Sequence, residues 1–212
     1  MPSLAWLHAA HRYSRRATGR RSAWLLPAEE ESISPLRILR DELEEPLVAR
    51  GFSVVTSAMP ADLRDSDLAL VGAHGSVWFD NGSFRAVSDE SQGRMSAAEL
   101  ASRLAGCGVA VLLVCSGGRL DREAFSIRMS GLSYELLHRG CRAVVASPWP
   151  LDALTARRWA LQFVDWYDAG GSVAEAAYFA NEAIRERAPH LCEFLAMHVI
   201  GDPLVRAEPG HG

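Results

Sequence analysis

The stretch LALVGAHGSVWF at residues 68–79 begins like a buried strand and then runs into a histidine. Its first six residues are apolar or small, as in a strand covered on both faces, whereas His74 is polar and precedes a glycine. A second run, VAVLLVCSGG at 109–118, follows the same plan and ends in Cys115, a serine and two glycines. Two buried strands that each lead into a chemically active side chain predict a site at one edge of a sheet.

Apolar runs alternate with helix-like segments along the rest of the chain. The near-continuous apolar strands indicate a parallel sheet with helices on both faces. We expect one α/β domain at 22–205, after a basic arm at 1–21 and before a tail at 206–212. Strands are expected at 22–28, 52–58, 66–74, 109–114, 142–149 and 193–201, and helices at 34–51, 96–106, 124–140, 151–170 and 172–187.

Individual residues predict where several elements begin, turn or end. Ser96, with a glutamate three residues later, has the pattern of a capping box. Asn81-Gly82 between alternating runs predicts a hairpin. Pro46 is expected to end or kink its helix, and Gly131 is a point at which the helix at 124–140 can break. The last residues, 202–212, have the composition of a frayed tail.

Composition narrows the function classes. The 212 residues are 49% hydrophobic and 23% charged, with a net charge of −4, which is ordinary for a soluble domain and gives no reason to expect nucleic acid or a membrane as partner. The four cysteines form no CxxC pair, so we expect free thiols and no metal or cofactor. No signal peptide or membrane-length run is visible, which predicts a cytoplasmic protein. The arginine-rich arm is interpreted as a solvated linker, with an RNA or protein contact as the alternative.

His74 and Cys115 have a chemical reason to lie together. In an open parallel sheet, functional groups collect where the carboxyl ends of strands meet the following loops. If the two strands are neighbours, about 4.8 Å apart, an imidazole and a thiol converge above the sheet. A thiolate is the nucleophilic form of cysteine, and an imidazole can take the thiol proton and later protonate a leaving amine. The amides of Gly75 and Cys115 are candidate oxyanion donors.

Each residue also has a structural interpretation. A cysteine that ends a buried strand is usually a packed thiol, and a single histidine is usually a polar group with a structural partner. The hypothesis of a catalytic pair rests on the repetition of the pattern on consecutive strands, each time beside glycine.

Five segments in order resemble the CHAT domain, a caspase-like module of the same cysteine-peptidase clan as caspases, separases and gingipains. The similarity runs from about residue 66 to 204. It comprises AHGS, AAELASRLAGCGVAVLLVCSGG, GLSYELLHRGCRAVVASPWPLDALTA, FVDWYDAGGSVAEAAYFANEAI and HVIGDP. The histidine also precedes the cysteine by roughly the interval found in caspases.

This resemblance implies a caspase-like three-layer sandwich with a mainly parallel sheet. It implies His74 as general base and Cys115 as nucleophile of a cysteine endopeptidase that cleaves a protein or peptide. Residues 146–152 would line the pocket for the residue before the scissile bond, with Ser147, Trp149 and Asp152 as substrate-binding residues. An added substrate strand would pair with the backbone of this segment.

The chain departs from the family pattern at the substrate pocket. The family commonly has two acidic residues after the tryptophan-proline run, whereas Asp152 is followed here by Ala153. In separase-like relatives the second acid recognises a basic residue, so a preference for arginine or lysine is not implied. Asp152 either replaces that acid or caps the following helix.

Relatives are often governed by a sensor or repeat module in bacterial defence or programmed-death systems. The resemblance therefore implies an activating protein partner, and we expect low activity until the substrate loops are ordered. Two alternatives stay open at this point. One is a catalytically inactive CHAT-like module that binds a partner through its sheet edge, and the other is an unrelated flavodoxin-like protein in which His74 and Cys115 are incidental.

Overall fold

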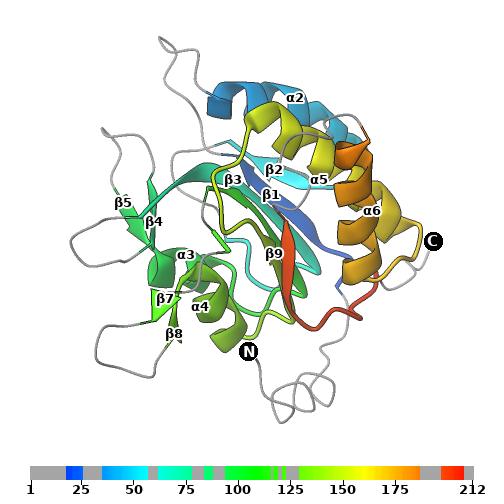
Figure 1. The fold of residues 1–212 in the computed structure, drawn as a ribbon. Helices are drawn as coiled ribbons and strands as arrows, with labels where there is room; N and C mark the ends of the chain where they lie inside the picture. The colour runs from blue at the N-terminus through cyan, green and yellow to red at the C-terminus, as the bar shows by residue number, and fades with distance from the viewer. Residues whose placement is uncertain are drawn as a thin grey trace.

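A central β-sheet organises the molecule (Figure 1). The computed structural model describes residues 18–25, 35–56, 62–77, 84–87, 94–115, 117–118, 121–122, 129–186 and 197–207. The main strands are β1 (Arg21–Leu25), β2 (Ser53–Val55), β3 (Leu68–Val77), β6 (Val109–Val114), β9 (Ala143–Ala146) and β10 (His198–Gly201). Their order is β10-β9-β6-β3-β1-β2, parallel except for β10. The prediction of a mainly parallel α/β sheet is confirmed.

Helices cover the sheet in two groups (Figure 1). Helix α5 (Ala153–Asp168) packs against both α2 (Pro35–Ala49) and α6 (Val173–Arg185), and α3 (Ala97–Arg103) packs against α4 (Leu132–His138) on the other side of the sheet. Because both faces are covered, every residue of β6 is buried. Leu39, Leu43 and Leu47 bury the inner stripe of α2, as their helical spacing predicts.

Two of the helices begin at a serine cap. The Ser96 hydroxyl accepts a hydrogen bond from the backbone N–H of Glu99, whose carboxylate accepts one in return from the N–H of Ser96. The same reciprocal pair forms between Ser172 and Glu175 at the start of α6. The capping box expected at residue 96 is therefore confirmed.

Helix α2 continues through Pro46 to Ala49, so the prediction that this proline ends the helix is wrong. A proline has no N–H to donate to the carbonyl four residues earlier, here that of Glu42. The Arg157 side chain of α5 donates to this carbonyl instead, at 3.3 Å. A tertiary contact thus replaces the missing helix hydrogen bond.

The strand that carries His74 does not end there, which corrects the expected boundary. Parallel pairing of β3 with β6 stops at Ala73, but β3 continues to Val77 and pairs antiparallel with β4 (Phe84–Val87). Strand β4 pairs in turn with β5 (Arg94–Ser96). The predicted hairpin is confirmed in its strands, and its turn at Asn81-Gly82 lies outside the described residues.

The helix expected at 124–140 is shorter than predicted. Residues Met129–Ser130 form β8, which pairs with β7 (Asp121–Arg122), and α4 begins only at Leu132. Gly131 lies between them with φ of 136°, a backbone conformation that glycine tolerates and that ends any helix. The helix break expected at this glycine is therefore observed.

Residues 202–207 pack against the domain, contrary to the expectation of a frayed tail. The Asp202 side chain is buried and pairs with Arg142, with Oδ2 3.1 Å from Nη2. The Val205 carbonyl accepts a hydrogen bond from the Val173 N–H at 2.8 Å. Apolar burial of Val205 and this buried ion pair hold the segment in place.

Candidate active site at the end of β3 and β6

Strands β3 and β6 bring His74 and Cys115 to the same edge of the sheet. The last residue pair of the parallel ladder is Ala73 with Val114, and His74 and Cys115 are the next residue of each strand. The expectation that the two strands are neighbours is confirmed. Because the ladder is continuous through the buried core, the relative position of the two residues follows from the register of the sheet.

Cys115 is the partly exposed thiol among the three cysteines that the structure describes; Cys107 and Cys141 are buried. The sulfur of Cys107 donates to the Leu63 carbonyl, and its hydrogen bond with Cys141, together with burial, raises the pKa of the Cys141 thiol. Buried thiols of this kind are unreactive. Cys192 lies outside the described residues.

His74 is exposed, although its surroundings partly exclude water. This desolvation lowers the pKa of the imidazole below its usual value because the charged form loses hydration. The neutral form therefore prevails at pH 7, and a neutral imidazole is the form that can accept a thiol proton.

Gly75 lets β3 approach the nucleophile closely. A Cβ atom at this position would lie 2.0 Å from the carbonyl oxygen of Cys115 and 2.7 Å from Cγ1 of Val114. No side chain fits in that space. The glycine is thus required by packing, and the role of its amide as an oxyanion donor stays a prediction.

The Gly117–Gly118 peptide helps to hold the loop after Cys115. The carbonyl of Gly117 accepts a hydrogen bond from the hydroxyl of Ser133 at 3.0 Å, and the N–H of Gly118 donates to the carbonyl of Ser147 at 2.8 Å. Both polar atoms of the Gly117–Gly118 peptide therefore have partners on other elements. Sequence reasoning missed Ser133, because a serine in the first turn of a helix is usually interpreted as part of a cap.

The segment 147–152 lies beside the sulfur. The Leu151 N–H donates to Cys115 Sγ at 3.4 Å. Ser147 is buried, and its hydroxyl accepts from the Trp149 N–H and donates to the Trp149 carbonyl, each at 3.0 Å. In this conformation the Ser147 side chain holds its own segment, so a contact with substrate stays a prediction.

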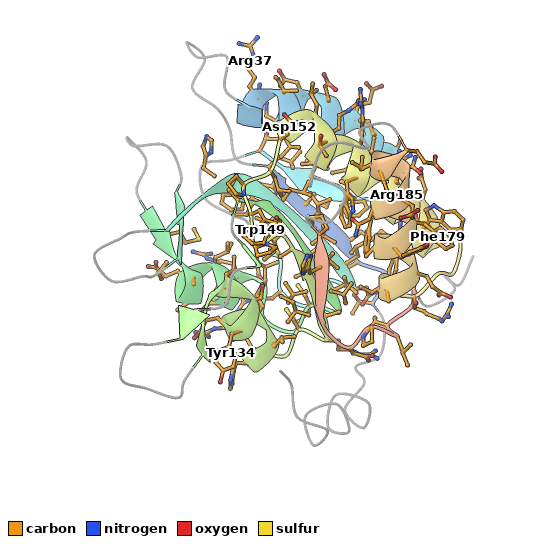
Figure 2. The ribbon with its side chains drawn as sticks, viewed as in Figure 1. Arg37, Tyr134, Trp149, Asp152, Phe179 and Arg185 are labelled. Atoms are coloured by element: carbon orange, nitrogen blue, oxygen red, sulfur yellow. The ribbon has the colours of Figure 1, made fainter. Side chains whose placement is uncertain are left out.

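Asp152 and Trp149 have different surroundings. Asp152 is the N-cap of α5, where its carboxylate accepts a hydrogen bond from the Thr155 N–H at 2.8 Å. The Trp149 side chain is 58% exposed. Figure 2 shows Asp152 at the start of α5, close to α2, and Trp149 apart from it, in front of the sheet. The helix-cap interpretation of Asp152 is thus observed.

The described residues meet the requirements neither of a metal centre nor of a membrane-spanning helix. Among the described residues, no group of three or more histidine, cysteine, aspartate or glutamate side chains could hold a metal ion. No helix in the same part of the chain is long and apolar enough to cross a membrane.

This mainly parallel sandwich is the fold of the caspase-like cysteine peptidases. The chain belongs to the CHAT domain family, which matches residues 27–190. No curated protein matches the chain.

Solved structures agree on the fold. Separase of Saccharomyces cerevisiae, in complex with securin, aligns with 94% of this chain at 15% identity and a TM-score of 0.65. The complex of the RgpB pro- and mature domains of Porphyromonas gingivalis aligns with 95% of this chain at 14% identity and a TM-score of 0.56. The Arg-specific cysteine proteinase gingipain R aligns with 89% of this chain at 13% identity and a TM-score of 0.51. The matches span 13%, 53% and 47% of those chains, so this chain corresponds to only part of each protein.

Proposed function

We propose that this chain is a cysteine endopeptidase that cleaves a protein substrate with Cys115 as nucleophile and His74 as general base. The observation that carries the proposal is the register of β3 and β6, which makes His74 and Cys115 the residues that directly follow a buried strand pair. Cys115 is also the accessible thiol among the described cysteines.

The proposed reaction proceeds in two stages. The thiol proton of Cys115 passes to the neutral imidazole of His74, and the sulfur attacks the substrate carbonyl carbon. The C–N bond then breaks, the imidazolium protonates the leaving amine, and a thioester remains on Cys115. Water, deprotonated by His74, hydrolyses the thioester, and the proton returns to the thiolate. The amides of Gly75 and Cys115 are the proposed donors to the oxyanion.

The proposed enzyme requires activation by a partner protein. The backbone groups that an incoming substrate strand would use are already bonded within the site: the Ser147 carbonyl to Gly118, both polar atoms of Trp149 to the Ser147 hydroxyl, and the Leu151 N–H to Cys115. Substrate pairing therefore needs a rearrangement of this segment, and a sensor or repeat-containing protein in a cytoplasmic, antiviral-defence type of assembly is the proposed trigger. The separase structure contains a protein partner, securin, which supports a protein partner here without indicating what that partner does.

The test offers the purified protein a proteome-derived peptide library and identifies new termini by mass spectrometry. Cuts that vanish in Cys115→Ala and persist in Cys192→Ala support the peptidase. If there are no cuts, and Cys115 is alkylated no faster than denatured-state cysteine and without dependence on His74, the protein is instead the non-catalytic binding module.

A further inference from the structure

Trp149 offers a large apolar surface in the segment beside the candidate nucleophile. The Leu151 N–H lies 3.4 Å from Cys115 Sγ, and Trp149 is two residues earlier in the same segment. Its indole is 58% exposed, although tryptophan is usually largely buried. A substrate residue next to the scissile bond has to lie close to the sulfur, and so within reach of this segment.

The backbone presents the indole in a defined position. The Ser147 hydroxyl bonds both the N–H and the carbonyl of Trp149, and the buried Ser147 side chain anchors this turn to the core. Pro148 and Pro150 flank the tryptophan and restrict φ on both sides. The two prolines restrict the backbone whether or not the Ser147 hydrogen bonds are kept when substrate binds, so the segment loses little conformational entropy when a ligand packs on the indole.

The charges around this segment do not favour a basic substrate residue. Between residues 147 and 158 the sequence contains one carboxylate, that of Asp152, and it caps α5 through the Thr155 N–H. Arg157 and Arg158 add positive charge to the first two turns of α5; Arg157 pairs with Glu42, whereas Arg158 is exposed. For a lysine or arginine of the substrate, this segment therefore offers one carboxylate, which already caps a helix, and the exposed like charge of Arg158 follows in the same helix.

The geometry points to a site that accepts a large apolar residue on the amino side of the scissile bond, with Trp149 as the side chain that contacts it. This specificity rests on the proposed peptidase function, and its position on the amino side rests on the resemblance to the CHAT domain, which implies that residues 146–152 line the pocket for that substrate residue. Packing on the indole removes apolar surface of both groups from water, and aromatic or branched aliphatic residues present the most such surface.

The test uses tripeptide acyloxymethyl ketones that are identical except for the residue beside the ketone: Phe, Leu, Arg, Lys or Asp. The rate of covalent labelling of Cys115 is followed by intact-mass spectrometry in a Cys192→Ser background. We expect the Phe and Leu probes to label roughly tenfold or more faster than the Arg and Lys probes. Trp149→Ala removes most of that difference, and Trp149→Phe restores part of it.

Two variants serve as controls. Trp166→Ala removes an indole that is 41% exposed near the other end of α5, and it leaves the preference unchanged. Asp152→Asn keeps a good helix cap but removes the charge, and it also leaves the preference unchanged.

The outcomes separate the specificity from the function. Fastest labelling by the Arg or Lys probe, lost in Asp152→Asn, overturns the apolar specificity while the peptidase stands. An apolar preference that persists in Trp149→Ala overturns the role of Trp149. Equal labelling by all five probes, at the rate that the same probes show with a small thiol and without dependence on His74, overturns the proposed function and the specificity with it.

Discussion

Gly75 lies directly against the backbone carbonyl of Cys115, and a Cβ atom on this glycine would be 2.0 Å from that oxygen. The contact couples the continuation of β3 to the nucleophile loop. It also explains why a glycine follows the histidine in a strand, where glycine is otherwise unfavourable.

Gly75→Ala should move the nucleophile loop away from β3, because the added methyl group meets backbone that cannot rotate aside. We expect a loss of about 1–3 kcal/mol in the free energy of unfolding, together with a changed rate of Cys115 alkylation. Urea denaturation and iodoacetamide kinetics measure the two effects.

Gly72→Ala is the matched control on the same strand. Its added methyl group would meet the ends of the Leu25 and Leu39 side chains, at 3.0 Å, rather than backbone. It should leave the alkylation rate of Cys115 unchanged. Equal alkylation rates in both variants would contradict the positioning role of Gly75.

Ser133→Ala should loosen the loop after the nucleophile from the opposite side, because the Gly117 carbonyl loses its hydroxyl donor inside the protein. A lost hydrogen bond of this kind costs about 1 kcal/mol, and we expect the alkylation rate of Cys115 to change as well. Ser102→Ala removes an exposed helical hydroxyl that donates to Ala98, and it should alter neither quantity substantially. An unchanged alkylation rate in Ser133→Ala would show that the backbone hydrogen bonds of Gly117 to Val114 and of Gly118 to Ser147 suffice to hold the loop.

The pH dependence of thiol reactivity should report on His74. Desolvation lowers the pKa of this imidazole from its usual 6.5, so the protonated form is populated only in more acidic solution. If neutral His74 takes the proton of Cys115, alkylation stays fast as pH falls to 6.5 and declines only below that value. His74→Ala moves the acid limb to higher pH, because alkylation then depends on the free thiolate alone. His138→Ala, at an exposed histidine of α4, leaves the limb unchanged. An acid limb centred above pH 6.5 would argue against this role.

Asp202→Ala should be strongly destabilising, because it leaves the partly buried guanidinium of Arg142 without its carboxylate. Loss of one partner from a buried pair costs about 3–5 kcal/mol, and the Asp202 side chain is only 1% exposed. Asp168→Ala breaks a more exposed pair with Arg21 and should cost about 0–1 kcal/mol. Chemical denaturation of the two variants compares them directly, and equal losses would show that residues 202–207 contribute little to stability.

The apolar pattern of the sequence was sufficient to predict the sheet, because buried parallel strands have a distinctive composition. The six consecutive apolar residues of β6 predict a strand in the core, and the residues of β3 are likewise apolar or small up to Ala73. The helix cap at Ser96 was equally predictable, since a capping box depends on residues three apart in sequence.

Other features were invisible because they depend on contacts between distant residues. The carbonyl that Pro46 leaves without a helix donor is bonded by Arg157, which is 115 residues away in sequence, and so α2 continues. The tail at 202–207 packs because Arg142 lies where Asp202 can pair with it. Local pattern carries no information on either partner.

The sequence by itself determined that His74 and Cys115 stand at one edge of a parallel sheet, because strand composition and alternation with helices dictate which ends of the strands meet. Only the tertiary structure decided how that edge is arranged. The Ser147 hydroxyl folds back on Trp149, Asp152 caps α5, and Ser133 holds the peptide after the nucleophile. Each of these hydrogen bonds depends on a local geometry that exists only after the strands and helices have packed.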